Sequence, residues 1–220
     1  MIHRATQTQV ILLLGPPGVG KGSQALLIKE KMEISHISTG ELLRDNIKRG
    51  TPLGKRFKSY IDAGQLAPDE LIFDLLFNRI DKEDCRKGFI LDGFPRTILQ
   101  AEELQKHLTE EHALIALSLE LPDSEIIQRL TKRLTCKQCQ APYHLLYSPP
   151  KSGGICDLCS GELMQRSDDV EEIVKKRIQV YHEKTAPLIG FYKSAGLLLS
   201  IDANRPKGAV LAEILQAVGD

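Results

Sequence analysis

Short apolar runs alternate along the chain with segments whose apolar residues recur at helical spacing. Residues 10–14 have the continuous hydrophobicity of a strand buried on both faces, and the pattern turns helical at residues 24–28. Three later apolar runs predict strands at residues 89–91, 114–119 and 197–201. Each is followed by a predicted helix, which begins at Thr97, Pro122 and Pro206 respectively. The helix from Pro122 carries the apolar residues Ile126, Ile127, Leu130 and Leu134. This alternation predicts an α/β fold, a mostly parallel sheet with helices on both faces.

Two segments break the alternation. Residues 38–67 are polar and helical with glycines as punctuation, and residues 134–166 contain cysteines, prolines and glycines with little regular periodicity. We interpret both as small insertions that project from one core domain, made of residues 1–37, 68–133 and 167–220. Because ligands of parallel sheets bind at the carboxyl ends of the strands, Gly15, Asp92 and Asp202 mark the edge where a site is expected.

A glycine-rich loop follows the first strand and carries the clearest chemical signal. Its sequence over residues 15–23 is Gly-Pro-Pro-Gly-Val-Gly-Lys-Gly-Ser, and it leads into a helix. Backbone N–H groups of such a loop turn inward on an anion, and Lys21 adds positive charge toward the outer phosphates. A tight turn with an incidental lysine is the alternative. Gly22 separates Lys21 from the hydroxyl of Ser23, which resembles the loop of nucleoside monophosphate kinases and would leave magnesium to phosphates and water.

Composition narrows the class of protein. The chain has 220 residues and a formal net charge of +0, so its totals give no basic footprint for nonspecific binding of nucleic acid. No apolar run reaches the roughly 18 residues of a membrane span, and the polar residues 1–9 lack the apolar core of a secretory signal. We therefore expect a cytoplasmic protein that binds neither nucleic acid nor membrane.

Four cysteines form two Cys-x-x-Cys pairs, Cys136 with Cys139 and Cys156 with Cys159. Sixteen residues separate the pairs, a spacing typical of a tetrahedral zinc site with four thiolate ligands. Disulfides are the alternative, but four cysteines within one insertion of a cytoplasmic enzyme favour metal. Because sulfur would fill every coordination position, the zinc would be structural and would stabilise a segment too small to bury its own core. Iron or another thiophilic metal stays an alternative occupant.

The two cysteine turns depart from the usual pattern in one respect. Glycine commonly follows the second cysteine, where φ is positive, whereas this chain has Gln140 and Ser160 there. His144 is a fifth candidate ligand that we expect to be a packing or surface residue instead. Cys85 lies outside the insertion and is expected to be a small buried apolar residue.

Arginines lie at predicted strand ends and at the borders of the second insertion. Arg96 follows the strand at 89–91, Arg129 and Arg133 are four apart on one face of the predicted helix, and Arg166 and Arg177 come after the insertion. A guanidinium group stays charged and presents a planar fork to phosphate oxygens. Each arginine alone is typical of a solvated surface, but their placement together indicates a site for a second phosphate group.

These motifs resemble those of the adenylate kinase family, in the long-lid, zinc-bearing type common in bacteria. The resemblance extends from Val10 to the C-terminus. It rests on Gly15-Pro-Pro-Gly-Val-Gly-Lys-Gly-Ser23, Ser38-Thr-Gly-Glu-Leu-Leu-Arg44, Asp92-Gly-Phe-Pro-Arg96 with Gln100, Arg166-Ser-Asp-Asp169 and Tyr181-His-Glu-Lys-Thr-Ala-Pro-Leu-Ile189. It implies reversible transfer of the γ-phosphoryl group of MgATP to AMP, giving two ADP, by a monomeric enzyme with structural Zn²⁺ and with Mg²⁺ bound to ATP.

The resemblance also implies ligand roles for individual residues. Asp92 would fix magnesium through water, and Gln100 would offer its amide to the adenine of AMP. The ATP-binding residues would be Gly18, Val19, Gly20, Lys21, Gly22, Ser23, Arg133, Pro142, Tyr143 and Arg205. The AMP-binding residues would be Thr39, Arg44, Gln65, Leu66, Ala67, Gly93, Phe94, Pro95, Arg96, Gln100, Arg166 and Arg177. The catalytic residues would be Lys21, Asp92, Arg96, Arg129, Arg133, Arg166 and Arg177. Ser23, Ala67 and Arg205 replace the usual threonine, valine and lysine.

Phosphoryl transfer of this kind requires aligned nucleotides and positive charge around the moving group. No general base is needed, because the AMP phosphate is already an anionic nucleophile. We expect both insertions to close as flaps that exclude water, with lid opening as the slow step. Asp168 would either pair with a phosphate-site arginine in the closed lid or cap the next helix together with Glu171.

Two rival functions are considered. One is a nucleoside monophosphate kinase that accepts CMP, UMP or GMP, for which Thr39 and Gln100 are the discriminating residues. The other is a zinc-ribbon nucleic-acid-binding protein with a vestigial nucleotide fold, although the second insertion lacks a stripe of basic and aromatic residues.

Overall fold

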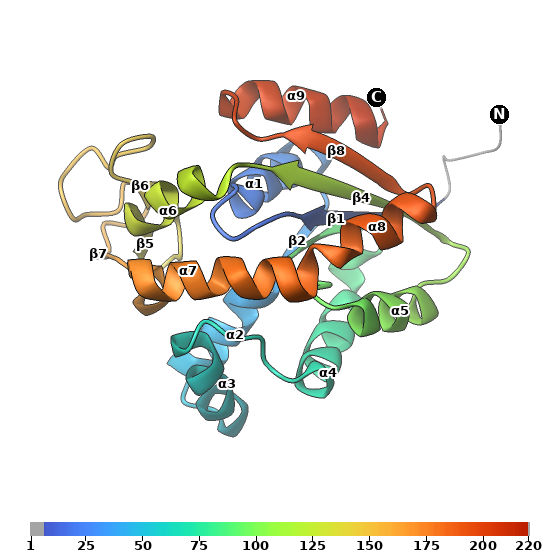
Figure 1. Ribbon diagram of the computed structural model, residues 1–220, viewed down its shortest axis with the longest axis horizontal. Helices are drawn as coiled ribbons and strands as arrows, with labels where there is room; N and C mark the ends of the chain where they lie inside the picture. Colours follow the sequence, from blue (N-terminus) through green and yellow to red (C-terminus); the bar gives the residue numbers. More distant parts are fainter. Residues whose placement is uncertain (1–6, 220) are drawn as a thin grey trace.

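The computed structural model describes residues 7–219. The expectation that residues 1–9 are not a secretory signal concerns in part residues 1–6, which lie outside that range. Within it, a five-stranded parallel sheet has the strand order β2-β3-β1-β4-β8 (Figure 1). The strands are β1 (Thr8–Leu14), β2 (Ser35–Ser38), β3 (Gly88–Asp92), β4 (His112–Glu120) and β8 (Leu198–Asp202). The four strands predicted from apolar runs are confirmed. The additional strand, β2, is short and half polar, so its sequence carries little signal.

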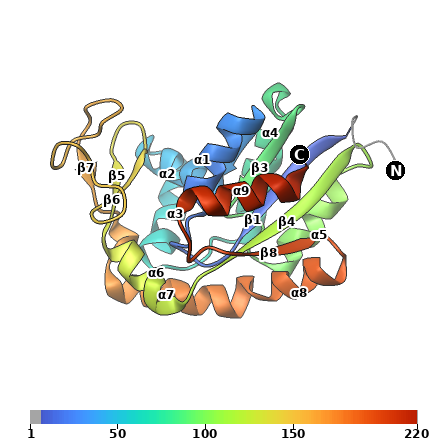
Figure 2. The ribbon, with the colours of Figure 1, turned by 90° about the horizontal axis from the view of Figure 1, so that it is seen from above.

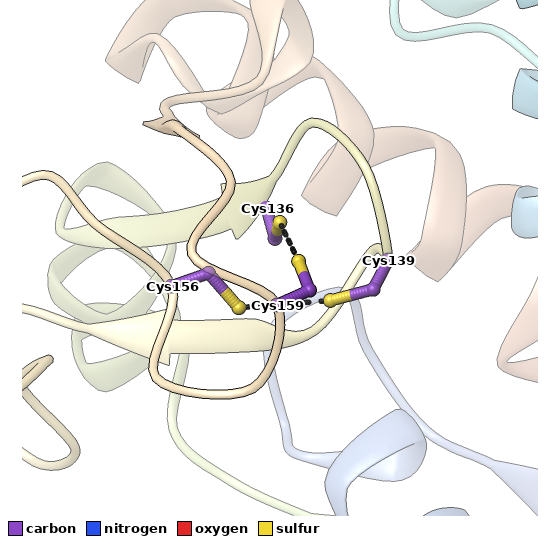
Figure 3. Close-up of side chains that lie close together, drawn as sticks. All are labelled: Cys136, Cys139, Cys156 and Cys159. Carbon is purple, nitrogen blue, oxygen red and sulfur yellow. Dashed lines mark hydrogen bonds between the residues drawn. The ribbon is translucent and has the colours of Figure 1, made fainter.

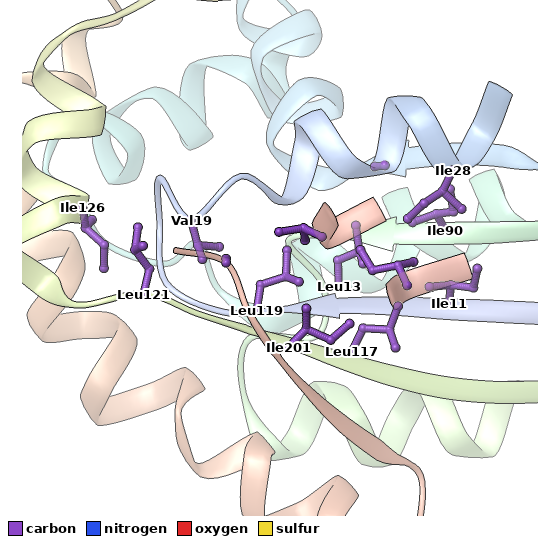
Figure 4. Close-up of a cluster of buried hydrophobic side chains, with 14 of the residues drawn as sticks. Ile11, Leu13, Val19, Ile28, Ile90, Leu117, Leu119, Leu121, Ile126 and Ile201 are labelled. Atoms are coloured by element: carbon purple, nitrogen blue, oxygen red, sulfur yellow. The ribbon is translucent and has the colours of Figure 1, made fainter. Parts of the chain in front are cut away.

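Helices cover both faces of this sheet, as the predicted fold class requires (Figures 1 and 2). One face packs against α1 (Lys21–Met32) and α9 (Lys207–Val218), and the other against α4 (Asp69–Ile80), α5 (Ile98–His107) and α8 (Pro187–Ser194). Side chains of a strand alternate between its faces, and β1 supplies Ile11 and Leu13 to the first core and Val10, Leu12 and Leu14 to the second. Figure 4 shows the first core between the sheet and α1. Both faces of β1 are therefore apolar.

Two further helices extend the core toward the carboxyl ends of the strands. They are α6 (Asp123–Thr131) and α7 (Glu171–Val180), and a π-helical turn (Tyr181–Thr185) joins α7 to α8. Val174 and Ile178 of α7 pack in the core, so this helix is anchored on one face. None of the helices between residues 7 and 219 is long and apolar enough to cross a membrane.

The first insertion consists of α2 (Thr39–Lys48) and α3 (Pro52–Asp62). Side chains cap both helices: the Ser38 hydroxyl accepts a hydrogen bond from the backbone N–H of Glu41, and Thr51 accepts one from Gly54. The predicted helical character of this segment is confirmed.

The second insertion contains a separate antiparallel sheet, with the order β6-β5-β7. Its strands are β5 (Arg133–Cys136), β6 (Pro142–His144) and β7 (Leu163–Met164). Cys136, Tyr143, Cys156 and Leu163 form its small core. Elsewhere two short 3₁₀ turns occur, Glu83–Cys85 and Ser167–Asp169.

The prediction that Arg129 and Arg133 share one helix face is wrong, as is the assignment of Leu134 to that helix. Helix α6 ends at Thr131, whose hydroxyl donates to the carbonyl of Ile127 one turn earlier. Arg133 and Leu134 belong to β5, where Leu134 lies opposite Tyr143 of β6. Cross-strand pairing in the insertion therefore overrides the helical spacing.

The capping role considered for Asp168 is also wrong. Helix α7 begins at Glu171, its N-cap residue is Val170, and no side chain caps it. Asp168 lies instead in the 3₁₀ turn before the helix, where its carboxylate pairs with Arg177 at 2.9 Å.

Candidate active site

The glycine-rich loop joins the carboxyl end of β1 to the first turn of α1. Gly20 is the N-cap residue of α1, with φ of 111°, and no side chain caps the helix. The first N–H groups of α1 are thus left to bind an anion. Gly15 has φ of 132°, and a Cβ there would lie 2.4 Å from the carbonyl oxygen of Leu119 on β4. The loop therefore needs glycine at this position both for its conformation and for its close approach to the sheet.

Lys21 lies inside this loop. Its Nζ donates to the carbonyl oxygens of Gly15 at 2.8 Å and Pro16 at 2.9 Å. Burial lowers the pKa of Lys21 to about 8, opposed by the charge of Asp92 and assisted by Arg96 and other arginines. None of the carboxylates between residues 7 and 219 contacts the ammonium group directly, so it is held among cations, an arrangement that a phosphate would relieve.

The segment after β3 forms the opposite wall of the site. The Nε of Arg96 donates to the carbonyl oxygen of Gly93 at 2.8 Å, and the Thr39 hydroxyl donates to the same oxygen at 2.6 Å. The backbone N–H of Arg96 donates to Oε1 of Gln100 at 2.7 Å. The Phe94–Pro95 peptide bond is cis. The hydrogen bond to Gly93 holds the Arg96 guanidinium against its own loop, in the same cavity that the glycine loop lines.

Arginines from several segments of the chain converge on the same region. Arg133 donates to both carboxylate oxygens of Asp169 at 2.8 and 2.6 Å, and Arg177 contacts Asp169 at 3.0 Å. The Nε of Arg166 donates to the hydroxyl of Thr135 at 2.9 Å. Burial, together with the neighbouring charges of Arg133 and Arg44, lowers the pKa of Arg166 to about 9. These half-buried cations repel one another, which favours an anionic ligand.

Burial also lowers the pKa of Arg44 and of Arg96. Arg44 comes from α2 of the first insertion, so this positive region joins the insertion to the core. Arg129 of α6 lines the same cavity near the glycine loop: its guanidinium is 5.8 Å from the ring centroid of Tyr147 and reaches the carbonyl oxygens of Val19 and Ala203 at 3.4 Å.

Asp92 ends β3 on the same side of the sheet as Lys21. Its carboxylate lies 3.6 Å from Nε2 of His36 on β2. Burial opposes ionisation of Asp92, but the His36 ring and the charge of Lys21 outweigh it, so the pKa of Asp92 is lowered. A carboxylate that stays ionised beside a phosphate loop suits a Mg²⁺ ion, which binds oxygen and keeps several waters.

The two insertions touch each other across the site. Lys48 at the end of α2 donates from Nζ to the carbonyl oxygen of Lys137 at 3.3 Å, and the Ser167 hydroxyl donates to Asp62 of α3 at 3.1 Å. The first contact joins residues 38–67 to residues 134–166, and the second joins α3 to the segment that directly follows the second insertion.

One cavity of about 1240 Å³ unites these features. It is larger than the roughly 300–1,000 Å³ typical of a site for one small molecule. Every residue predicted to bind ATP lines it, as do all those predicted to be catalytic and all those predicted to bind AMP except Phe94. The Phe94 side chain is buried in the second core instead, so only its backbone is available to a ligand.

The four predicted metal ligands also come together, as Figure 3 shows. Their Sγ atoms all lie within 4.8 Å of one another, with 3.4 Å between Cys136 and Cys159 and 3.6 Å between Cys139 and Cys156. Sulfurs at about 2.3 Å from a tetrahedral zinc would be about 3.8 Å apart, so this set fits the ion. A disulfide requires about 2.05 Å, and all five cysteines, which lie within the described residues, are free thiols.

The cysteine turns adopt the expected backbone in spite of their sequence. Gln140 has φ of 62° and Ser160 has φ of 58°, the positive values for which glycine is usual. The Tyr143 hydroxyl lies 3.4 Å from Cys156 Sγ and lowers the pKa of that thiol to about 6. His144 lies outside the sulfur cluster, and its Nδ1 accepts backbone N–H groups of Leu146 and Tyr147. The buried position of Cys85 is as predicted.

Asp169 and His36 belong to the site although the sequence assigns them no role. Asp169 is 0 % exposed and neutralises two arginines, and His36 faces the candidate magnesium carboxylate. The position of Asp169 three residues after Arg166 is a partial signal. His36 has none, because its partner is fifty-six residues away in the sequence and meets it only by strand pairing.

Comparison with known proteins finds similar sequences over most of the chain. The family model described as adenylate kinase matches residues 13–197. A curated adenylate kinase of Caldicellulosiruptor bescii is 49% identical over 211 residues, 95% of this chain and 98% of that protein. An adenylate kinase of Clostridium novyi is 52% identical over 197 residues, 89% and 91% of the two chains, and one of Methanocella arvoryzae is 46% identical over 209 residues, 94% and 97%.

Proposed function

The chain belongs to the adenylate kinase family, and from this premise we propose that it transfers the γ-phosphoryl group of MgATP to AMP, reversibly, giving two ADP. The observation that carries this proposal is the single cavity between the glycine loop and the Arg96 segment. The cavity offers an anion site at each side and half-buried arginines between them. Two nucleotides joined through their phosphates match this distribution of charge.

The donor phosphates are proposed to lie on the glycine loop, where the N–H groups of residues 18–23 and Lys21 bind them. Arg133, Pro142, Tyr143 and Arg205 would complete the ATP side. The acceptor AMP is proposed to lie against Thr39, Arg44 and the segments 65–67 and 93–96, with Gln100 at its base and Arg166 and Arg177 at its phosphate. The lining of the cavity by these residues supports the assignment.

In the reaction, an oxygen of the AMP phosphate bonds to the γ-phosphorus, and the bond from that phosphorus to the β–γ bridging oxygen breaks. Lys21, Arg96, Arg129, Arg133, Arg166 and Arg177 hold the oxygens in line and offset the charge as it moves to the leaving ADP. Mg²⁺, when bound with ATP, would neutralise phosphate charge beside Asp92. No general base is required, because the acceptor is already ionised.

Zn²⁺ is proposed to occupy the four cysteines as a structural ion. The tetrahedral spacing of the sulfurs supports it, and a full set of thiolates leaves no position for a catalytic water. The ion would keep β5–β7 and their loops rigid as one body.

Residues 38–67 and 134–166 are proposed to act as an AMP-binding flap and a lid that close over the nucleotides and exclude water. The contacts Lys48–Lys137 and Ser167–Asp62 support a closed arrangement. The pair Asp168–Arg177 would hold the base of the lid. Opening of the lid is the proposed slow step. The protein is further proposed to be cytoplasmic, as expected from its composition, and monomeric, as the family resemblance implies.

The function is tested by a coupled assay of ADP formation from AMP and MgATP, with zinc analysis on the same sample. We expect rapid turnover, AMP preferred over CMP, UMP and GMP, and about one zinc per chain. Lys21→Ala should lose nearly all turnover, whereas Lys29→Ala, an exposed lysine of the same helix, should keep it. Folded, metal-replete protein that leaves AMP unchanged would refute the proposal, and a salt-dependent shift of labelled RNA or DNA would favour the zinc-ribbon alternative.

A further inference from the structure

The Gln100 side chain is held at both ends of its amide. It lines the cavity, yet it is only 3 % exposed. Its Oε1 accepts the backbone N–H of Arg96 at 2.7 Å, and its Nε2 donates to Oδ1 of Asp69 at 2.6 Å. A backbone N–H can only donate and an ionised carboxylate can only accept. The two partners therefore fix which end of the amide is oxygen and which is nitrogen.

Asp69 lies behind Gln100, outside the lining of the cavity. It belongs to the first turn of α4, while Gln100 belongs to α5. Its second oxygen, Oδ2, accepts the hydroxyl of Thr97 at 3.1 Å, and that hydroxyl in turn accepts the backbone N–H of Gln100 at 3.2 Å. Asp69 is thus anchored by the N-cap of α5 and has little freedom to follow a turning amide.

The orientation of this amide decides which purine it can pair with. With one partner taken at each end, Gln100 keeps one N–H donor and one oxygen lone pair for a ligand. The six-membered-ring edge of adenine offers an amino donor at C6 and an acceptor at N1. Guanine and hypoxanthine offer the reverse, an oxygen at C6 and a donor N1–H. A base of fixed position is therefore accepted or rejected according to which way the amide faces.

We propose that Asp69 is a positioning residue that sets the preference for adenine, because it locks the Gln100 amide in the orientation that pairs with adenine and opposes guanine and hypoxanthine. This rests on the proposed function, in which Gln100 faces the base of the acceptor. Asp69 acts through Gln100 and does not itself touch the nucleotide.

The test compares Asp69→Asn with Glu70→Gln. Each removes one negative charge from the first turn of α4, but Glu70 is exposed and makes no hydrogen bond to Gln100 in the described part of the chain. An asparagine can turn its NH₂ toward Gln100, which removes one of the two contacts that oppose the reversed amide and leaves the Arg96 N–H as the other. We measure kcat/KM with AMP, IMP and GMP, and KM for ATP, in the wild type and in both variants.

In D69N the ratio of kcat/KM for AMP over IMP should fall about tenfold, the value of one hydrogen bond, mainly through a higher KM for AMP. KM for ATP should stay within about twofold, because the donor side does not contact Asp69. E70Q should keep the wild-type ratio. Asp69→Glu, which keeps a group that only accepts, should lie closer to the wild type than D69N.

An unchanged AMP/IMP ratio in D69N, an equal fall in E70Q, or an equal fall in D69E would overturn the inference while leaving the kinase assignment intact. Wild-type protein that phosphorylates neither AMP nor IMP would overturn both.

Discussion

When Lys21 is replaced by methionine, the free energy of unfolding of the ligand-free variant, minus that of the wild type, should be larger at neutral pH than at alkaline pH. The same replacement should remove kinase activity. Burial lowers the pKa of Lys21 from 10.5 to about 8 in the folded protein. Between these values the unfolded chain binds a proton at Lys21 that the folded chain has released. The wild-type free energy of unfolding therefore gains from rising pH in this window.

The size of the effect follows from the shift. The difference between a pKa of 10.5 in the unfolded chain and about 8 in the folded protein corresponds to about 3 kcal/mol. This is the free-energy cost of keeping the charge buried below pH 8. A methionine side chain cannot titrate, so the free energy of unfolding of the variant minus that of the wild type should be largest near pH 7 and should shrink by about 3 kcal/mol toward pH 10.5. The carbonyls of Gly15 and Pro16 lose their donor at every pH. The change with pH, not the absolute difference, therefore reports the charge.

The assay is urea unfolding of ligand-free wild type and Lys21→Met at intervals from about pH 7 to about pH 10, because urea is uncharged and does not screen the site. Lys29→Met, at an exposed position of the same helix, corrects for the general loss of a lysine. A difference between Lys21→Met and wild type that stays constant across this range would refute the argument that the cation is held at a cost.

Three further outcomes follow from the site. Arg96→Ala should reduce kcat/KM by at least about a hundredfold with little change in melting temperature, because the guanidinium lies among other cations whose repulsion its removal relieves; comparable losses of both would mean that Arg96 is architectural. Asp169→Asn should cost roughly 3–5 kcal/mol in urea unfolding, since it leaves Arg133 without its carboxylate and Arg177 with Asp168 alone, whereas Asp45→Asn, which breaks an exposed pair with Arg49, should cost less than about 1 kcal/mol. Chelation of the metal, or Cys139→Ser, should lower the melting temperature and the zinc content, and Cys85→Ser should leave the zinc content unchanged; full removal of metal with unaltered melting would disprove a structural ion.

Much of the fold and of the candidate site could be predicted from local patterns in the sequence. The apolar run over residues 10–14 could be assigned to a strand because both faces of a covered parallel strand are apolar, and the glycine loop could be assigned to phosphate because its spacing places N–H groups at a helix start. The four cysteines could be paired as ligands because each Cys-x-x-Cys turn presents two thiolates by itself. In each case the chemistry lies within a few neighbouring residues.

Long-range contacts decided the rest. Helical spacing placed Arg133 on α6, but pairing of β5 with β6 ends the helix at Thr131 and directs Arg133 to Asp169, thirty-six residues away. Likewise Asp168 has the spacing of a helix cap relative to Glu171, but its carboxylate forms an ion pair with Arg177 instead.

The sequence alone identifies an α/β fold with a phosphate-binding loop and an insertion that carries four thiolates. It can do so because the apolar periodicity, the glycine loop and the cysteine pairs are periodic or local signals. Which arginine meets which aspartate, and which carboxylate fixes the amide of Gln100, follows only from the packing of α4 against α5 and of the insertions against the core. Charge pairs have no sequence period. Their energies depend on burial and distance, which exist only once the chain has folded.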